Sequence, residues 1–162
     1  MRVGDVMMRT PASCSPKTNL GAAVEILWTR NCGILPVVGA EGRVIGVITD
    51  RDICIALATR NQMAGEIDVS QVFSGRLIAC RPEDDIRVAL AAMGNSKVRR
   101  LPVVDVEGKL VGILSMDDVV LHANAGVMGR APELSHDEVM EALKQVYRPN
   151  LPEMAPRAAA AA

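Results

Sequence analysis

The stretch Leu35-Pro36-Val37-Val38 occurs a second time as Leu101-Pro102-Val103-Val104, 66 residues further along the chain. The same spacing aligns other residues of the two halves: Glu41-Gly42 with Glu107-Gly108, Gly46 with Gly112, and Asp52 with Asp118. The register holds without a gap from residue 3 to about residue 57. An ungapped match of this length indicates an internal duplication, in which each copy is one structural unit.

Each copy has the pattern of a β-α-β-β-α unit, because apolar residues at helical spacing alternate with β-branched runs around a Glu-Gly turn. The first copy predicts a short element with Val3 and Val6, extended residues 12–14, a helix over 20–27 stopped by Gly33, strands at 37–38 and 44–48, and a helix from Thr49. The second copy predicts extended residues 78–80, a helix over 84–94, strands near Val103 and over 110–114, and a helix from Ser115.

One copy of about 55 residues buries too little surface to be comfortably stable alone. Its strands are apolar with little alternation, as expected of a sheet that is covered on both faces. We therefore predict an α/β fold of two tandem β-α-β-β-α repeats, residues 1–60 and 66–124, packed about a pseudo-twofold axis. Such a pair has two equivalent grooves between the copies, and grooves at domain interfaces are preferred ligand sites.

The residues after the repeats predict one more helix and a tail. Ser135 to Glu138 form a capping-box pattern, and the apolar residues that follow share one helical face: Val139, Leu143, Val146 and Tyr147. We predict an amphipathic helix over 133–147 that docks on its own module or, alternatively, contacts a partner. Residues 148–162 contain three prolines and end in five alanines, a composition that predicts a disordered tail.

The composition argues against two classes of partner. The formal net charge is −1 and the aromatic residues are Trp28, Phe73 and Tyr147, so neither broad attraction to nucleic acid nor base stacking is expected. No apolar run reaches the roughly 20 residues that span a bilayer. The N-terminus also lacks the apolar region of a secretory signal. We expect a cytoplasmic protein with neither nucleic acid nor membrane as its partner.

The sequence offers no pattern for a metal site or for catalysis. The two histidines, His122 and His136, are not at ligand spacing with any of the cysteines: Cys14, Cys32, Cys54 and Cys80. We expect these cysteines to be small apolar core thiols, kept reduced in the cytosol. No nucleophile–base pair and no Walker-type phosphate loop is visible, so an enzyme is not expected.

Residue by residue, 1–124 resembles the cystathionine-β-synthase (CBS) domain pair, also called a Bateman module. The resemblance rests on the hydrophobic-Pro-Val-Val strand, the Glu-Gly hairpin and the strand-to-helix segments 46–52 and 112–118. Such modules typically bind adenine nucleotides or related adenosyl ligands and regulate an attached or associated protein. The resemblance thus implies a sensor of AMP, ADP or ATP without a catalytic cofactor, a homodimer and a separate regulated partner. The alternative is an assembly module with vestigial grooves.

Two pairs of polar residues stand at the predicted helix starts: Thr49 with Asp52, and Ser115 with Asp118. As capping boxes they would satisfy the free amides of the first helical turn. As ligand residues, the carboxylate would accept both ribose hydroxyls, and the hydroxyl would lie beside a phosphate or ribose oxygen. The resemblance favours this ribose role, which does not exclude capping.

The resemblance also places phosphate-binding and adenine-binding residues. Lys97, Arg99 and Arg100 precede the second Pro-Val-Val strand and can form charge-assisted bonds to phosphate, unless they belong to a solvated basic loop. Arg51 and His122 are weaker candidates. An apolar slot for adenine would be lined by residues that could equally be plain core aliphatics: Ala12, Ile34, Val47, Ile78 and Ile113.

Overall fold

The computed structural model describes residues 1–124 and 132–148. Its helices and strands follow in chain order: α1 (Val3–Val6), β1 (Met8–Arg9), α2 (Leu20–Thr29), β2 (Ile34–Val38), β3 (Val44–Thr49), α3 (Asp50–Arg60), α4 (Ile86–Ser96), β4 (Arg100–Val104), β5 (Leu110–Ser115), α5 (Met116–His122) and α6 (His136–Tyr147). Short 3-10 turns lie at Ala40–Gly42, Ala64–Glu66 and Val69–Gln71.

The two predicted hairpins form, and they match each other in detail. Strand β2 pairs antiparallel with β3, and β4 pairs antiparallel with β5. The register shifts once in each hairpin, after Val37 and after Val103. The turns contain Gly42 at φ 76° and Gly108 at φ 82°, a left-handed conformation that glycine adopts without steric cost. The Glu-Gly pairs therefore mark equivalent turns, which differ at the glutamate, because Glu41 is also left-handed at φ 66°.

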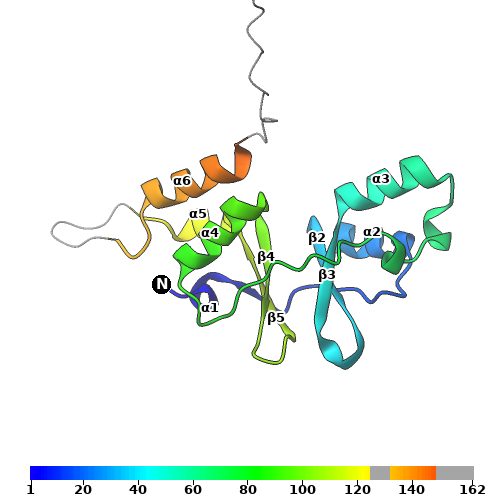
Figure 1. Ribbon diagram of the computed structural model, residues 1–162, viewed down its shortest axis with the longest axis horizontal. Coiled ribbons are helices and arrows are strands. Elements are labelled where there is room, and N and C mark those ends of the chain that lie inside the picture. The colour runs from blue at the N-terminus through cyan, green and yellow to red at the C-terminus, as the bar shows by residue number, and fades with distance from the viewer. Residues whose placement is uncertain (125–131, 149–162) are drawn as a thin grey trace, which may run out of the picture.

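The buried residues form two clusters. They correspond to the two halves of the molecule, of which one contains α2, β2, β3 and α3 and the other contains α4, β4, β5, α5 and α6 (Figure 1). In the first cluster, residues of α2, β2, β3 and α3 pack together with Ile67 and Val69. The second cluster joins β4, α4, α5 and α6, and it also contains Val3 and Val6 of α1. We call these halves the first lobe and the second lobe.

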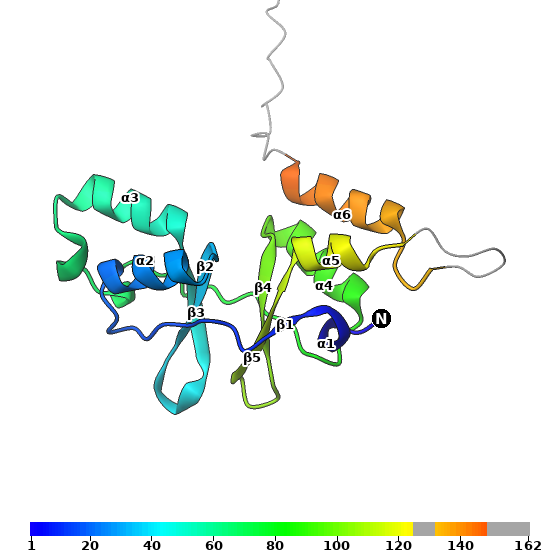
Figure 2. The same cartoon turned by 180° about the vertical axis from the view of Figure 1, so that it is seen from behind.

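The leading segment of each sequence repeat packs in the lobe of the other repeat. Strand β1 pairs with β5, with Met8 opposite Ile113, and Figure 2 shows the N-terminal segment running along the second lobe. The equivalent segment of the second repeat returns to the first lobe, where Ser74 bridges to Val47. The two repeats of the sequence are therefore interleaved in space, which ties the lobes together.

A pseudo-twofold axis relates the two lobes, as the paired contacts show. The Arg2–Asp85 bridge has its counterpart in Asn19–Asp68, and the Cys14–Val37 bridge has its counterpart in Cys80–Val103. Arg43 bridges to its own counterpart, Lys109, so the axis passes between the two hairpin turns. The predicted α/β pair of tandem repeats is confirmed.

Several element ends differ from the prediction. Helix α2 ends at Thr29, and the chain leaves it through Asn31 at φ 49°, so Gly33 is not the helix stop. Asparagine adopts the left-handed conformation more readily than most residues. The predicted extended residues 12–14 and 78–80 form single bridges, through Cys14 and Cys80, in place of full strands.

Helix α6 docks on its own module, against α4 and α5 (Figure 1). Its buried residues are Val139, Ala142 and Val146, whereas Tyr147 is exposed. Gly94 of α4 permits this close approach, because an added Cβ would lie 3.1 Å from the Gln145 Cβ as well as 2.6 Å from its flexible Oε1. The predicted tail lies outside the described residues, except for Arg148.

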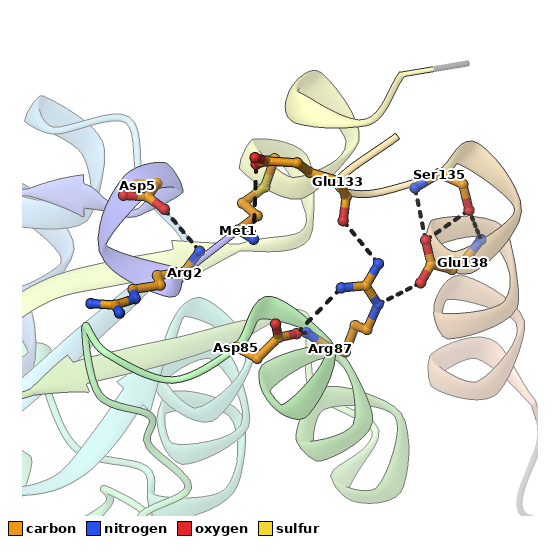
Figure 3. Close-up of polar contacts among 8 residues, drawn as sticks. All are labelled: Met1, Arg2, Asp5, Asp85, Arg87, Glu133, Ser135 and Glu138. Carbon is orange, nitrogen blue, oxygen red and sulfur yellow. Dashed lines mark hydrogen bonds and ion pairs between the residues drawn. The ribbon is translucent and has the colours of Figure 1, made fainter. Parts of the chain in front are cut away.

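Polar contacts anchor the start of α6 (Figure 3). Arg87 Nε donates to Glu138 Oε1 at 2.6 Å, and Arg87 Nη2 donates to Glu133 O at 2.9 Å. Glu138 also accepts from the Ser135 backbone and hydroxyl. The Ser135 backbone bond and Arg87 lower the pKa of Glu138 to about 2, so this carboxylate is charged at neutral pH. These contacts join the first turn of α6 to α4 and fix where the helix begins.

Candidate functional site

A groove of about 790 Å³ lies between the two lobes. Its walls come from the start of β2, the β3–α3 junction, the segment between the repeats, the α4–β4 junction and the end of α6. It is lined by Gly33, Ile34, Val47, Thr49, Asp50, Arg51, Ser74, Arg76, Ile78, Ser96, Lys97, Val98, Arg99, Arg100, Pro102, Val146 and Tyr147. Both lobes therefore contribute to one site, at the interface where the sequence predicted a ligand groove.

The groove is strongly basic, because five cationic side chains line it: Arg51, Arg76, Lys97, Arg99 and Arg100. Asp50 is the acidic residue among the lining residues. Arg100 Nη2 lies 3.8 Å from Asp117 Oδ2. Arg100 Nη1 and Asp50 Oδ2 both lie close to Gly33, at 3.6 and 3.5 Å from the position that an added Cβ would take. An excess of convergent positive charge at a site of this size favours an anionic ligand.

All four predicted phosphate residues come together in this groove, although they come from different lobes. Lys97 ends α4 in the left-handed conformation, and its ammonium group donates to the Gln145 carbonyl. Arg99 Nη1 donates to the Tyr147 hydroxyl at 3.3 Å. Of the two weaker candidates, Arg51 lines the groove and His122 does not; the His122 Nδ1 lies 2.8 Å from Asp118 O.

The capping boxes predicted at Thr49 and Ser115 are formed. Asp52 Oδ2 accepts from the Thr49 backbone at 2.9 Å and from its hydroxyl at 2.7 Å. Asp118 Oδ2 does the same for Ser115, at 3.0 and 2.6 Å. Within residues 1–124 and 132–148, the Oδ1 atom of Asp52 accepts no hydrogen bond. Thr49 lines the groove, whereas Asp52, Ser115 and Asp118 do not.

The five predicted adenine residues divide between two places. Ile34, Val47 and Ile78 line the groove and form its apolar wall. Ala12 and Ile113 are the repeat counterparts of Ile78 and Val47, and they lie across the pseudo-twofold axis instead. Ile113 is buried there, and Ala12 lines a separate hollow of about 500 Å³ beside α2.

The basic character of the groove is not repeated across the axis. Arg51, Arg76 and Lys97 have Asp117, Thr10 and Asn31 as their counterparts, 66 residues away. One change runs the other way, since Ser96 has Arg30 as its counterpart. The duplication has thus diverged in charge, and the described groove is the more cationic of the two equivalent positions.

Sequence reasoning missed Arg76, Val146 and Tyr147. A signal for Arg76 existed, because it stands two residues before Ile78, in a segment already expected to approach the groove. Val146 and Tyr147 could be predicted only as members of one helical face, because the docking of α6 decides that its last turn reaches the groove.

A second hollow of about 670 Å³ lies between α2 and α3 of the first lobe. It is mostly apolar, and its lining includes Val24, Leu27, Trp28, Ile53, Cys54 and Leu57. Trp28 is 84% exposed, which is unusual for so large an apolar side chain. These residues belong to α2 and α3.

The four cysteines are free, and they differ in burial. Burial raises the pKa of Cys14 to about 11 and that of Cys80 to about 12, which keeps both protonated. Cys54 is exposed, so the expectation of four core thiols was wrong at this position, which faces outward on α3. The described residues contain no group of His, Cys, Asp and Glu that could hold a metal ion. Among them, too, no helix combines the length and apolar character needed to cross a membrane.

The sequence and the fold of this chain are similar to those of known proteins. The CBS-domain profile matches residues 3–59 and 69–124. The CBS domain-containing protein YhcV of Bacillus subtilis (strain 168) is 30% identical over 139 residues, covering 85% of this chain and 97% of that protein. The solved structure of CBSX2 in complex with AMP is 28% identical with a TM-score of 0.65, covering 74% of this chain and 93% of CBSX2.

An enzyme also contains a similar segment. The homoserine O-acetyltransferase of Methanohalophilus mahii (strain ATCC 35705 / DSM 5219 / SLP) is 29% identical over 119 residues, which cover 74% of this chain. The matched segment makes up 24% of that enzyme. The similarity is therefore to one part of the enzyme, about a quarter of its length.

Proposed function

The chain belongs to the CBS-domain family, and we propose that it is a regulatory module that binds an adenine nucleotide in the groove between its lobes and signals to a partner protein. The observation that carries this proposal is the combination of five cationic side chains with an apolar wall in one groove. Adenine offers a flat apolar face and the phosphates offer charge, so a nucleotide matches both parts. The AMP complex of CBSX2 supports the choice of AMP, ADP or ATP as ligand.

The groove suggests how a nucleotide would lie in it. The adenine would rest against Ile34 of β2 and Val47 of β3, and against Ile78, which packs against the second lobe. The phosphates would then meet Arg99, Arg100 and the other cations. Arginine forms paired, charge-assisted bonds to phosphate oxygens, which favours phosphorylated ligands over adenosine.

Ribose would lie between these two ends, beside Thr49 at the start of α3. We propose that Asp52 turns its unengaged Oδ1 to the ribose hydroxyls while its Oδ2 keeps the helix cap. Ser115 and Asp118 would play the same role at the equivalent position across the axis. There, fewer cations are available, so a phosphorylated ligand would be bound less well.

Regulation without catalysis remains part of the proposal, as do a homodimer and a cytoplasmic location. In the enzyme relative, the similar segment makes up about a quarter of the chain, which is consistent with a regulatory segment attached to a catalytic one. The four cysteines are free thiols, as suits a reducing compartment. The five cations argue against the alternative, an assembly module with vestigial grooves. Like charges that converge in one groove repel one another, and without a bound anion this repulsion is not offset.

The experiment is to replace Arg99 and Arg100 together by alanine and to measure binding of AMP and of adenosine by calorimetry. Each charge-assisted bond contributes about 1.5–3 kcal/mol, so AMP should bind at least about tenfold more weakly, while adenosine should bind nearly as before. The matched control replaces Arg43 and Lys109 by alanine. These side chains lie exposed at the hairpin turns, and their replacement removes the same net charge. Equal losses for AMP and adenosine would show that the two arginines do not bind phosphate.

A further inference from the structure

The end of α6 forms part of the groove, although α6 lies outside both repeats. The family profile ends at residue 124, and α6 begins at His136. Its last turn nevertheless contributes Val146 and Tyr147 to the lining of the groove. A site built by the repeats alone would have no wall at this position.

Tyr147 reaches the groove as an exposed side chain and not as a core residue. Val146 is buried in the second lobe, whereas Tyr147 is 62% exposed. Two polar contacts hold this turn against the basic residues: Lys97 donates to the Gln145 carbonyl, and Arg99 Nη1 donates to the Tyr147 hydroxyl. The phenol therefore lies among the cations that we assign to phosphate.

We propose that Tyr147 is a ligand-contacting residue that selects for phosphate, an inference that rests on the proposed function. A phenolic hydroxyl that accepts a bond from Arg99 still has its own proton to donate. A phosphate oxygen in this part of the groove is the acceptor that matches it. Arg99 has five N–H donors, so its contact with Tyr147 leaves others for the same phosphate. Tyr147 thus donates to the ligand and also positions Arg99.

This contact links the ligand to an element outside the repeats. The Arg148 amide donates to the Lys144 carbonyl at 2.8 Å, which closes the last turn of α6. A phosphate held by Tyr147 would restrain this turn, because opening it would break the bond to the ligand. Occupancy of the groove would then be transmitted to the C-terminal end of α6, where a partner could detect it.

The test compares Tyr147→Phe with the full-length parent, using calorimetric binding of AMP and adenosine. The phenylalanine keeps the ring and removes the hydroxyl, so α6 should stay docked. We expect AMP to bind about tenfold more weakly and adenosine to change less than about twofold. The matched control is Met140→Ala, an exposed position on α6 that does not line the groove, and it should bind both ligands as the parent does.

A second readout is amide hydrogen exchange of residues 144–148. AMP should slow exchange there in the parent, and this protection should be lost in Tyr147→Phe at equal occupancy. The proposal is overturned if Tyr147→Phe binds AMP like the parent or weakens AMP and adenosine equally. These outcomes differ from failure of the proposed function, in which the parent itself binds no adenine nucleotide.

Discussion

Thr49, Ser115 and Ser135 each begin a helix and each form a capping box with the acid three residues later. The cap alone therefore does not mark a ligand site, because Ser135 and Glu138 form it far from the groove lining. Thr49 differs in its surroundings, since it lines the groove next to Arg51. The sequence predicted the caps correctly, but it could not separate these positions, because the difference lies in tertiary neighbours.

Replacing Asp52 by alanine tests whether this carboxylate does more than cap α3. If it accepts ribose hydroxyls, AMP affinity should fall by roughly 1.5–3 kcal/mol, or about ten- to a hundredfold in Kd. Loss of a first-turn acid alone should cost about 0.3–1 kcal/mol of stability. Calorimetry and thermal melts on the same protein separate the two effects.

The matched variant is Asp118→Ala, which removes the same cap in the second lobe. We expect it to melt earlier by a similar amount and to bind AMP as the parent does, because AMP prefers the basic groove. An Asp52→Ala protein that melts earlier but keeps parental AMP affinity would refute the ribose assignment.

The residues predicted to bind phosphate show how much of the groove could be predicted from the sequence. Lys97, Arg99 and Arg100 lie at the junction of α4 and β4, Arg51 lies in the first turn of α3, and the structure brings all four to the groove lining. Their role in binding phosphate stays a prediction. Tyr147 was predicted on the same helical face as Val146, but the docked helix leaves it exposed. The helical repeat of 3.6 residues predicts which apolar residues share one face of α6. Only the packing of α6 on α4 decides which residues at the border of that face are exposed to solvent.

At the scale of elements, the exchange of the leading segments between the lobes could not be predicted. Val3 and Val6 match Val69 and Val72 in the repeat, so either pair could fill either core by local pattern alone. The choice depends on non-local pairing, in which β1 lies along β5 and Ser74 approaches Val47. By contrast, the hairpins and helices were predicted well because their signals are local.

Gly46 and Gly112 permit this close approach of the exchanged segments. A Cβ added at Gly46 would lie 2.2 Å from the Ser74 carbonyl oxygen, which belongs to the backbone and cannot move alone. At Gly112 the nearest atom, at 2.6 Å, is the sulfur of Met7, a flexible side chain, with Met8 O at 2.9 Å. The two glycines are equivalent by the pseudo-twofold symmetry, but a side chain added at each would have to displace different atoms.

We predict that Gly46→Ala lowers the free energy of unfolding by about 3 kcal/mol or more, and that Gly112→Ala costs less, at about 1–3 kcal/mol. Urea denaturation measures both. Gly65→Ala is the control, since nothing lies within 4 Å of its added Cβ, and it should change stability by less than about 0.5 kcal/mol. Equal, small effects at Gly46 and Gly65 would contradict the described contact between the interleaved segments.

At the scale of the whole molecule, the apolar hollow between α2 and α3 suits a symmetric contact with a second copy. A closed dimer would cover Trp28 and the neighbouring aliphatic residues. Light scattering of the parent should therefore give a dimer mass at micromolar concentration, and Trp28→Glu should shift it to monomer. Val106→Glu, at an exposed hairpin position, should stay dimeric. A parent of monomer mass would rule out this assembly.

The measurement that tests the central proposal most directly is a calorimetric titration of the full chain with AMP and, separately, with adenosine. We predict that AMP binds with one strong site per chain and at least about tenfold more tightly than adenosine, because the cations of the groove act on the phosphate. Absence of binding heat for AMP, ADP, ATP and adenosine, confirmed by equilibrium dialysis, would contradict the proposal. The assembly module with vestigial grooves would then be the better description of this protein.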